Sequence, residues 1–86
     1  MGHINVTTVG VILDQIKVYS KRAAKNRLSG RIQAALETES VVDSLIRTAE
    51  EHGFSKGAVE YKENGINEAY VDAREDDDLK RRMEIR

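Results

Sequence analysis

The chain has 86 residues, of which 40% are hydrophobic and 34% charged, with a net charge of −1 at pH 7 and no cysteine. A chain of this length can bury one hydrophobic core, and this balance is typical of a folded domain rather than of a disordered one. The lack of cysteine excludes disulfides, thiolate metal sites and cysteine nucleophiles. No stretch approaches the roughly 20 apolar residues that span a bilayer. We therefore expect a cytoplasmic protein with one domain at 1–75 and a charged C-terminal tail, helical or frayed, at 76–86.

The net charge conceals a strong segregation of charge along the chain. Residues 17–31 contain six basic residues and no acidic one, whereas residues 37–78 contain thirteen acidic and four basic residues. The segment from Leu79 to the end returns to a charge of +3. These blocks indicate surfaces of opposite sign on one small protein.

A first amphipathic helix is predicted from Thr7 or Thr8, either of which can cap it, to about Asn26. The β-branched run from Ile4 to Val9 also favours a short N-terminal strand. Apolar residues at helical spacing mark the buried face of the helix: Val9, Ile12, Leu13, Ile16, Tyr19, Ala23 and Ala24.

Two further helices are predicted in the middle of the chain. Ser29 can cap a short helix at 30–37, and Ser40 can cap a third helix that Gly53 would end in the left-handed conformation. Phe54 is placed to fold back onto the last apolar turn of that third helix. Its buried stripe comprises Val41, Val42, Leu45, Ile46 and Ala49.

The pair Asn64-Gly65 lies between two alternating segments, 57–63 and 66–71. Such a pair is a strong signal of a β-hairpin, because both residues accept the positive φ of a type I′ turn. The expected fold class is α+β, with three helices followed by an antiparallel β-hairpin, a possible third strand at the N-terminus and a short C-terminal helical tail. Pairing would place one set of side chains against the helices, namely Val59, Tyr61, Ile66 and Tyr70.

The tail is a candidate partner-docking segment. Asp76 or Asp77 can start a last turn or two of helix, and its apolar residues offer an anchor for a partner. The residues predicted to dock are Asp76, Asp77, Asp78, Leu79, Met83 and Ile85.

The basic block is a candidate site for a polyanion or for an acidic protein surface. Four of its side chains fall on the polar face of the first helix, where they can follow phosphates or pair with the acidic block of the same chain or of a second copy. The residues are Lys17, Lys21, Arg22, Lys25, Arg27 and Arg31.

Catalytic, cofactor and metal sites find no support in the sequence. The acidic run from Asp72 to Asp78 lacks the alternating ligands and the glycine of a cation-binding loop. His52 falls at a helix end, where an imidazolium is stabilised by the helix dipole, and no glycine elbow surrounds a serine. We expect no enzyme activity and no cofactor.

The function predicted from these features is that of a small non-enzymatic regulatory or adaptor protein, of the kind found in bacteria and phages. It would act through protein–protein interaction and as a homo-oligomer, because small domains without disulfides or metals often gain stability from a second copy. The alternative is sequence-independent nucleic-acid binding through the basic face of the first helix. No membrane partner is expected.

Overall fold

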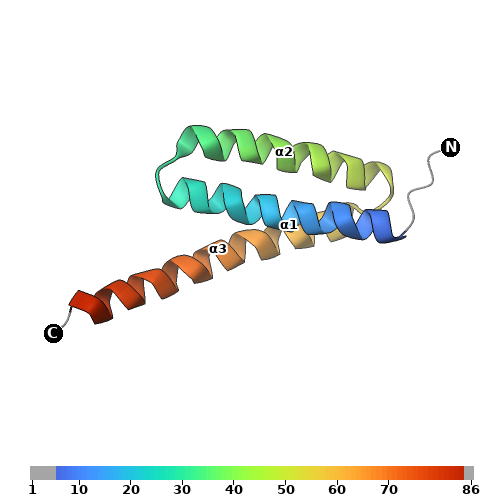
Figure 1. Ribbon diagram of the computed structural model, residues 1–86. Coiled ribbons are helices and arrows are strands. Elements are labelled where there is room, and N and C mark those ends of the chain that lie inside the picture. The colour runs from blue at the N-terminus through green and yellow to red at the C-terminus, as the bar shows by residue number, and fades with distance from the viewer. Residues whose placement is uncertain (1–5, 85–86) are drawn as a thin grey trace.

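The computed structural model describes the backbone of residues 6–84 and the side chains of 8–77 and 79–81. Over this range the chain forms three helices and no strand: α1 (Val6–Leu28), α2 (Ile32–Glu51) and α3 (Ser55–Glu84). Figure 1 shows α2 running back along α1 and α3 running in the same direction as α1. α1 packs along both neighbours, whereas α2 and α3 contact each other much less. The fold is all-α, and the predicted α+β class is wrong.

Each connection between helices is a tight turn around one left-handed glycine. At the end of α1, Gly30 has φ 77°, and at the end of α2, Gly53 has φ 83°. The N–H of Arg31 donates to Asn26 O at 2.8 Å, and the N–H of Phe54 donates to Ala49 O at 2.9 Å, so both turns have the Schellman hydrogen bond. The predicted stop at Gly53 is confirmed.

The predicted first helix is confirmed as α1, which runs on to Leu28. Its apolar face supplies Ile16, which is fully buried and belongs to the core with Val42, Ala49 and Ala58. The expected N-terminal strand is wrong for Val6–Val9, which belong to the helix, and its other residues lie outside the described range. Amphipathic periodicity therefore prevails over the β-branched composition of this segment.

The second and third predicted helices are a single helix, α2. Ser40 lies exposed in its interior, and Ser29 belongs to the turn that ends α1 rather than capping a new helix. The buried residues Ala35, Val42 and Ala49 recur every seven positions and keep one stripe against α1 across the predicted break. Thr38 lies within the helix, and its hydroxyl donates to Ala34 O at 2.8 Å.

The predicted β-hairpin is absent, since both of its segments and the Asn64-Gly65 pair lie inside α3. Gly65 is buried against α1, and a Cβ built on it would lie 2.3 Å from Lys17 O and 3.1 Å from Ser20 Cβ. Its lack of a side chain therefore lets two helix backbones approach closely, rather than allowing a positive φ. The fully buried Ala58 and Ala69 lie on the same stripe of small residues.

The predicted C-terminal tail is continuous with α3. That helix has 30 residues, about 45 Å at 1.5 Å per residue, and makes the molecule elongated, with principal extents of 63 × 25 × 17 Å. Figure 1 shows its C-terminal end diverging from α1 and running beyond the other helices. Residues 73–84 are called the α3 extension below.

Gly65→Ala should destabilise the fold by about 1–3 kcal/mol, because the new methyl group must push α3 away from the backbone of α1. Gly10→Ala is the matched control: Gly10 lies in α1 with nothing within 4 Å of a built Cβ, so alanine should stabilise by about 0.5–1 kcal/mol. Urea unfolding followed by circular dichroism measures both. Equal gains at the two positions would contradict the close helix approach.

Candidate protein-docking surface

The basic face of α1 lies against acidic residues of α3. Lys17 Nζ is 3.5 Å from Glu68 Oε2, Lys21 Nζ is 3.2 Å from Asp72 Oδ2, and Lys25 Nζ is 2.9 Å from the same Asp72 oxygen. The three lysines recur every four residues, one per helical turn, so they form a ladder along the α1–α3 seam. The three lysines were predicted to lie on the polar face of the first helix, and the structure pairs them with acids of α3.

The arginines of the basic block point elsewhere. Arg27 makes a bidentate ion pair with Glu39 of α2, with its Nη2 at 2.7 Å from Glu39 Oε1. The guanidinium of Arg22 lies 5.1 Å from the centroid of the Tyr19 ring, within the range of a cation–π contact. Arg31 precedes the first residue of α2, and its side chain is exposed. The six basic residues are therefore not one surface.

These ion pairs shift the titration of the two acids that receive them. Hydrogen bonds from Lys25 and then from Lys21 to the Asp72 carboxylate lower its pKa below the usual 3.8. The hydrogen bond from Arg27 lowers the pKa of Glu39 and raises the pKa of Arg27. Both acids remain partly exposed, so solvent screens the pairs.

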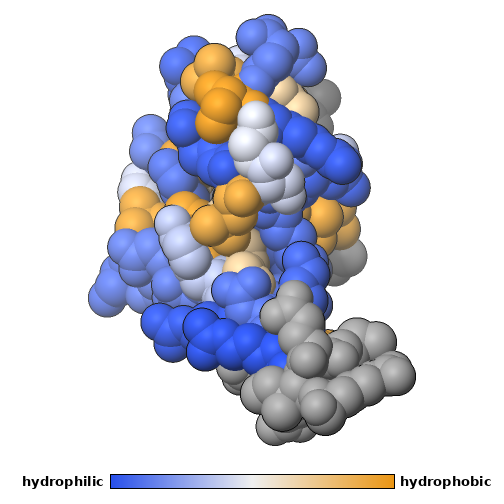
Figure 2. All heavy atoms as spheres, turned by 90° about the vertical axis from the view of Figure 1, so that its left-hand side faces the viewer, coloured by the Kyte–Doolittle hydropathy of each residue, from blue (hydrophilic) through white to orange (hydrophobic). Residues whose placement is uncertain are grey.

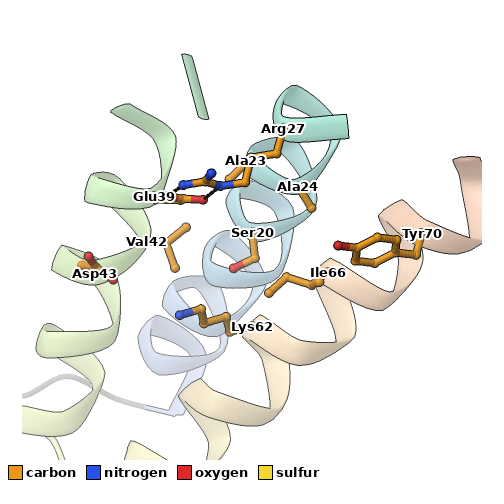
Figure 3. A pocket seen from close by; sticks show the side chains of 10 residues that line it. All are labelled: Ser20, Ala23, Ala24, Arg27, Glu39, Val42, Asp43, Lys62, Ile66 and Tyr70. Carbon is orange, nitrogen blue, oxygen red and sulfur yellow. Dashed lines mark hydrogen bonds and ion pairs between the residues drawn. The ribbon is translucent and has the colours of Figure 1, made fainter. Parts of the chain in front are cut away.

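A groove opens where α2 and α3 separate over α1. It has a volume of about 470 Å³, its floor is formed by α1, and its walls carry Val42 on one side and Ile66 and Tyr70 on the other. Figure 3 shows the Arg27–Glu39 pair at one end of the groove and Lys62 reaching across from α3 at the other. An apolar floor between charged ends can receive an apolar side chain of a partner.

Ser20 lies at the base of this groove and is 2% exposed. Its hydroxyl is buried without a hydrogen-bond partner among the described residues. Such a group costs free energy, but a small side chain is needed here, because the backbone of α3 passes directly over it at Gly65. Serine therefore suits position 20 because it is small, and its hydroxyl is not needed there.

The described side chains of the α3 extension from 74 to 81 are exposed to solvent. Leu79 is 56% exposed, and Tyr70, which connects the groove wall to the extension, is 52% exposed. Asp76 and Asp77, two of the predicted docking residues, are also exposed and belong to no ion pair among the described side chains. The side chains of Asp78 and Met83, and all of Ile85, lie outside the described residues. Figure 2 looks at the molecule from the end where the extension emerges and shows small apolar patches separated by polar surface.

Sequence reasoning missed the groove and Ser20, because both depend on α3 being a helix. The signal that could have revealed them is the helical spacing of Ala58, Gly65 and Ala69, which marks a close helix contact. Over the part of the chain that the structure describes, no helix is long and apolar enough to cross a membrane, and no three histidine, aspartate or glutamate side chains are grouped to hold a metal ion.

Comparisons with protein families, with curated protein sequences and with solved structures found no match to this chain.

Asp72→Asn should lower stability at pH 7 and should have little effect at strongly acid pH. The folded pKa of Asp72 is lowered, so its stabilising contribution is complete above the unfolded value of 3.8 and is lost as the pH falls through the folded value. The midpoints of urea unfolding at about pH 7, 4 and 2.5 measure this change in stability, because these pH values span the range in which carboxyl groups titrate. Glu60→Gln, at an exposed acid without an ion pair among the described residues, is the control. If Asp72→Asn changed the stability by the same amount at every pH, the ion pairs of Asp72 with the lysine ladder would be contradicted.

Ser20→Ala should leave the fold intact and stabilise it by about 1 kcal/mol, because it removes a buried hydroxyl that has no partner. Thr38→Val is the control, since the hydroxyl of Thr38 has a partner and its loss should cost about 0.5–1 kcal/mol. Thermal and urea unfolding measure both variants. A loss of stability in Ser20→Ala would show that the hydroxyl has a partner in solution.

Proposed function

We propose that this chain is a non-enzymatic protein-interaction module that docks on its partner through the α3 extension. The observation that carries the proposal is a helix that runs on past the last ion pair between α1 and α3, at Asp72, with every described residue from 74 to 81 exposed. Most of the stability of a helix in a protein comes from tertiary packing, so a partner that covers the extension would add the packing that this part of α3 lacks.

The composition of the extension favours a protein partner. It combines an exposed leucine with dense charges of both signs, and the apolar wall of the groove, with Ile66 and Tyr70, leads into it along α3. An aromatic or aliphatic anchor surrounded by charges is the usual arrangement of a protein–protein contact. The proposed docking surface therefore comprises the extension and the adjoining wall of the groove.

The charge ladder weighs against nucleic-acid binding as the main function. Lys17, Lys21 and Lys25 are paired with acids of α3 that a phosphate would have to displace, and those acids would repel it. The arginines of the same block lie on other faces, so no continuous basic track remains along α1. The salt-dependent polyanion binding predicted from the sequence has less support than protein docking.

A photo-crosslinking amino acid at Leu79 or at Tyr70 should trap a protein when the full chain is expressed in its native host. The same amino acid at Val18, which is equally exposed but lies on α1, is the control. The adduct is identified by mass spectrometry, tested with nuclease and protease, and competed with unlabelled chain. A nuclease-sensitive adduct, or equal trapping at all three positions, would contradict the proposal.

A further inference from the structure

We infer that the partner of the α3 extension is a second copy of this chain, bound antiparallel about a two-fold axis at Leu79. This inference rests on the proposed function and specifies the partner. It follows from the order of charges along the extension, together with the absence of an intrachain partner for that segment among the described residues.

The charges of the extension are opposite on the two sides of Leu79. An acidic run, Glu75-Asp76-Asp77-Asp78, precedes the leucine, and a basic run, Lys80-Arg81-Arg82, follows it. In an antiparallel pair, residues equally distant from the axis lie at the same level along the two helices. The acid–base pairs at matching levels are Asp78 with Lys80, Asp77 with Arg81, Asp76 with Arg82, and Glu84 with Arg74.

Every charged residue from 76 to 84 thus shares its level with an opposite charge of the other copy, and no two like charges share a level. Because successive residues of a helix are about 100° apart, Asp77 and Arg81 lie on the face opposite Leu79 and contribute only through long-range attraction. The two-fold axis repeats each pair, which is the self-complementarity that a symmetric homodimer requires. A parallel in-register pair would place each acid beside the same acid of the second copy, so like charges would repel along the whole contact. Charge order therefore selects the antiparallel arrangement.

Ion pairs within one helix are the competing explanation of this order, because acids four residues before bases stabilise an isolated helix. Asp76 is four residues before Lys80, and Asp77 is four residues before Arg81. The described side chains of these four residues form no ion pair with one another. Their charges are therefore available to a second copy.

Leu79 supplies the apolar centre of the contact. It lies at the two-fold axis, is 56% exposed, and would meet its own counterpart. One leucine per copy surrounded by charged residues makes a small contact, typical of a reversible association. Because exposed charges guide this pairing, it should weaken as salt screens them.

The first test is the mass of the full chain by sedimentation and light scattering from about 5 µM to about 500 µM, at low and high salt. We expect a monomer–dimer equilibrium whose dissociation constant rises by about tenfold or more between roughly 20 mM and 500 mM salt. A monomer at every concentration would overturn the inference. If Leu79 still traps another protein in that case, the proposed function survives without it.

Two charge variants test the pairing itself. An all-acidic chain carries Lys80→Glu, Arg81→Glu and Arg82→Glu, and an all-basic chain carries Asp76→Lys, Asp77→Lys and Asp78→Lys. Each alone should be monomeric, and an equimolar mixture should form the heterodimer. A control for the total charge of the all-basic chain changes three exposed acids outside the extension, with Glu50→Lys, Glu51→Lys and Glu60→Lys, and should dimerise as the wild type does.

Circular dichroism of each variant separates loss of pairing from loss of helix. If intrahelical ion pairs were the role of these charges, the variants would lose helicity while their masses stayed those of the wild type. That result would overturn the inference. Dimers of unchanged strength from either variant alone would overturn it as well.

Single cysteines test the orientation, since the native chain has none. Glu75→Cys and Met83→Cys lie at the same level in the antiparallel pair, so oxidation of their mixture should give a disulfide-linked heterodimer. Each alone should link poorly, because its counterpart is displaced by eight residues, about 12 Å along the helix. Efficient linkage of Glu75→Cys with itself would indicate a parallel pair and contradict the proposed axis.

Discussion

The close approach of α3 to α1 at Gly65 is the constraint on which the other features of this structure depend. A carbonyl of α1 occupies the position that a side chain at residue 65 would need, and Ser20 fits beneath the crossing because it is small. This contact fixes the height of α3 against α1 and brings Glu68 and Asp72 level with the lysines. The charge ladder is therefore a consequence of backbone packing, since exposed ion pairs alone contribute at most about 1 kcal/mol each.

The same crossing determines which surfaces stay open. α3 follows α1 closely but not α2, and the separation of α2 and α3 leaves the groove above Ser20 and Ala23. The core is correspondingly small, with Ile16 as its only large side chain that is fully buried among the described residues. The α1–α3 contact is made by small residues, and a groove separates α2 from α3. One chain therefore buries little apolar area, and a partner would bury more of it.

Sequence reasoning succeeded where the local signal was strong enough to decide the structure. The apolar periodicity of α1 prevailed over the β-branched residues at its start, and the glycine predicted to end a helix in the left-handed conformation does so at the end of α2. It failed at Gly65, where glycine can mean either a turn or a close approach of backbones, and only the position of α1 decides between them. It also divided α2 at Ser40, because a serine that can cap a helix is also tolerated at an exposed position within one.

The sequence indicates which residues of the candidate site are charged, but it does not indicate which of them contact each other. The charge blocks are visible in the sequence, but their partners depend on whether residues 57–71 form strands or a helix, since a hairpin would have carried the acids away from α1. Once that segment is helical, the acids at 68 and 72 fall on the seam, while the acids from 75 to 78 belong to the diverging extension. One acidic block thus divides into a part that neutralises its own chain and a part that remains available, and the position of that division follows from where α3 leaves α1. The docking role proposed for the extension therefore depends on the geometry of the helix crossing as much as on the charges of the extension.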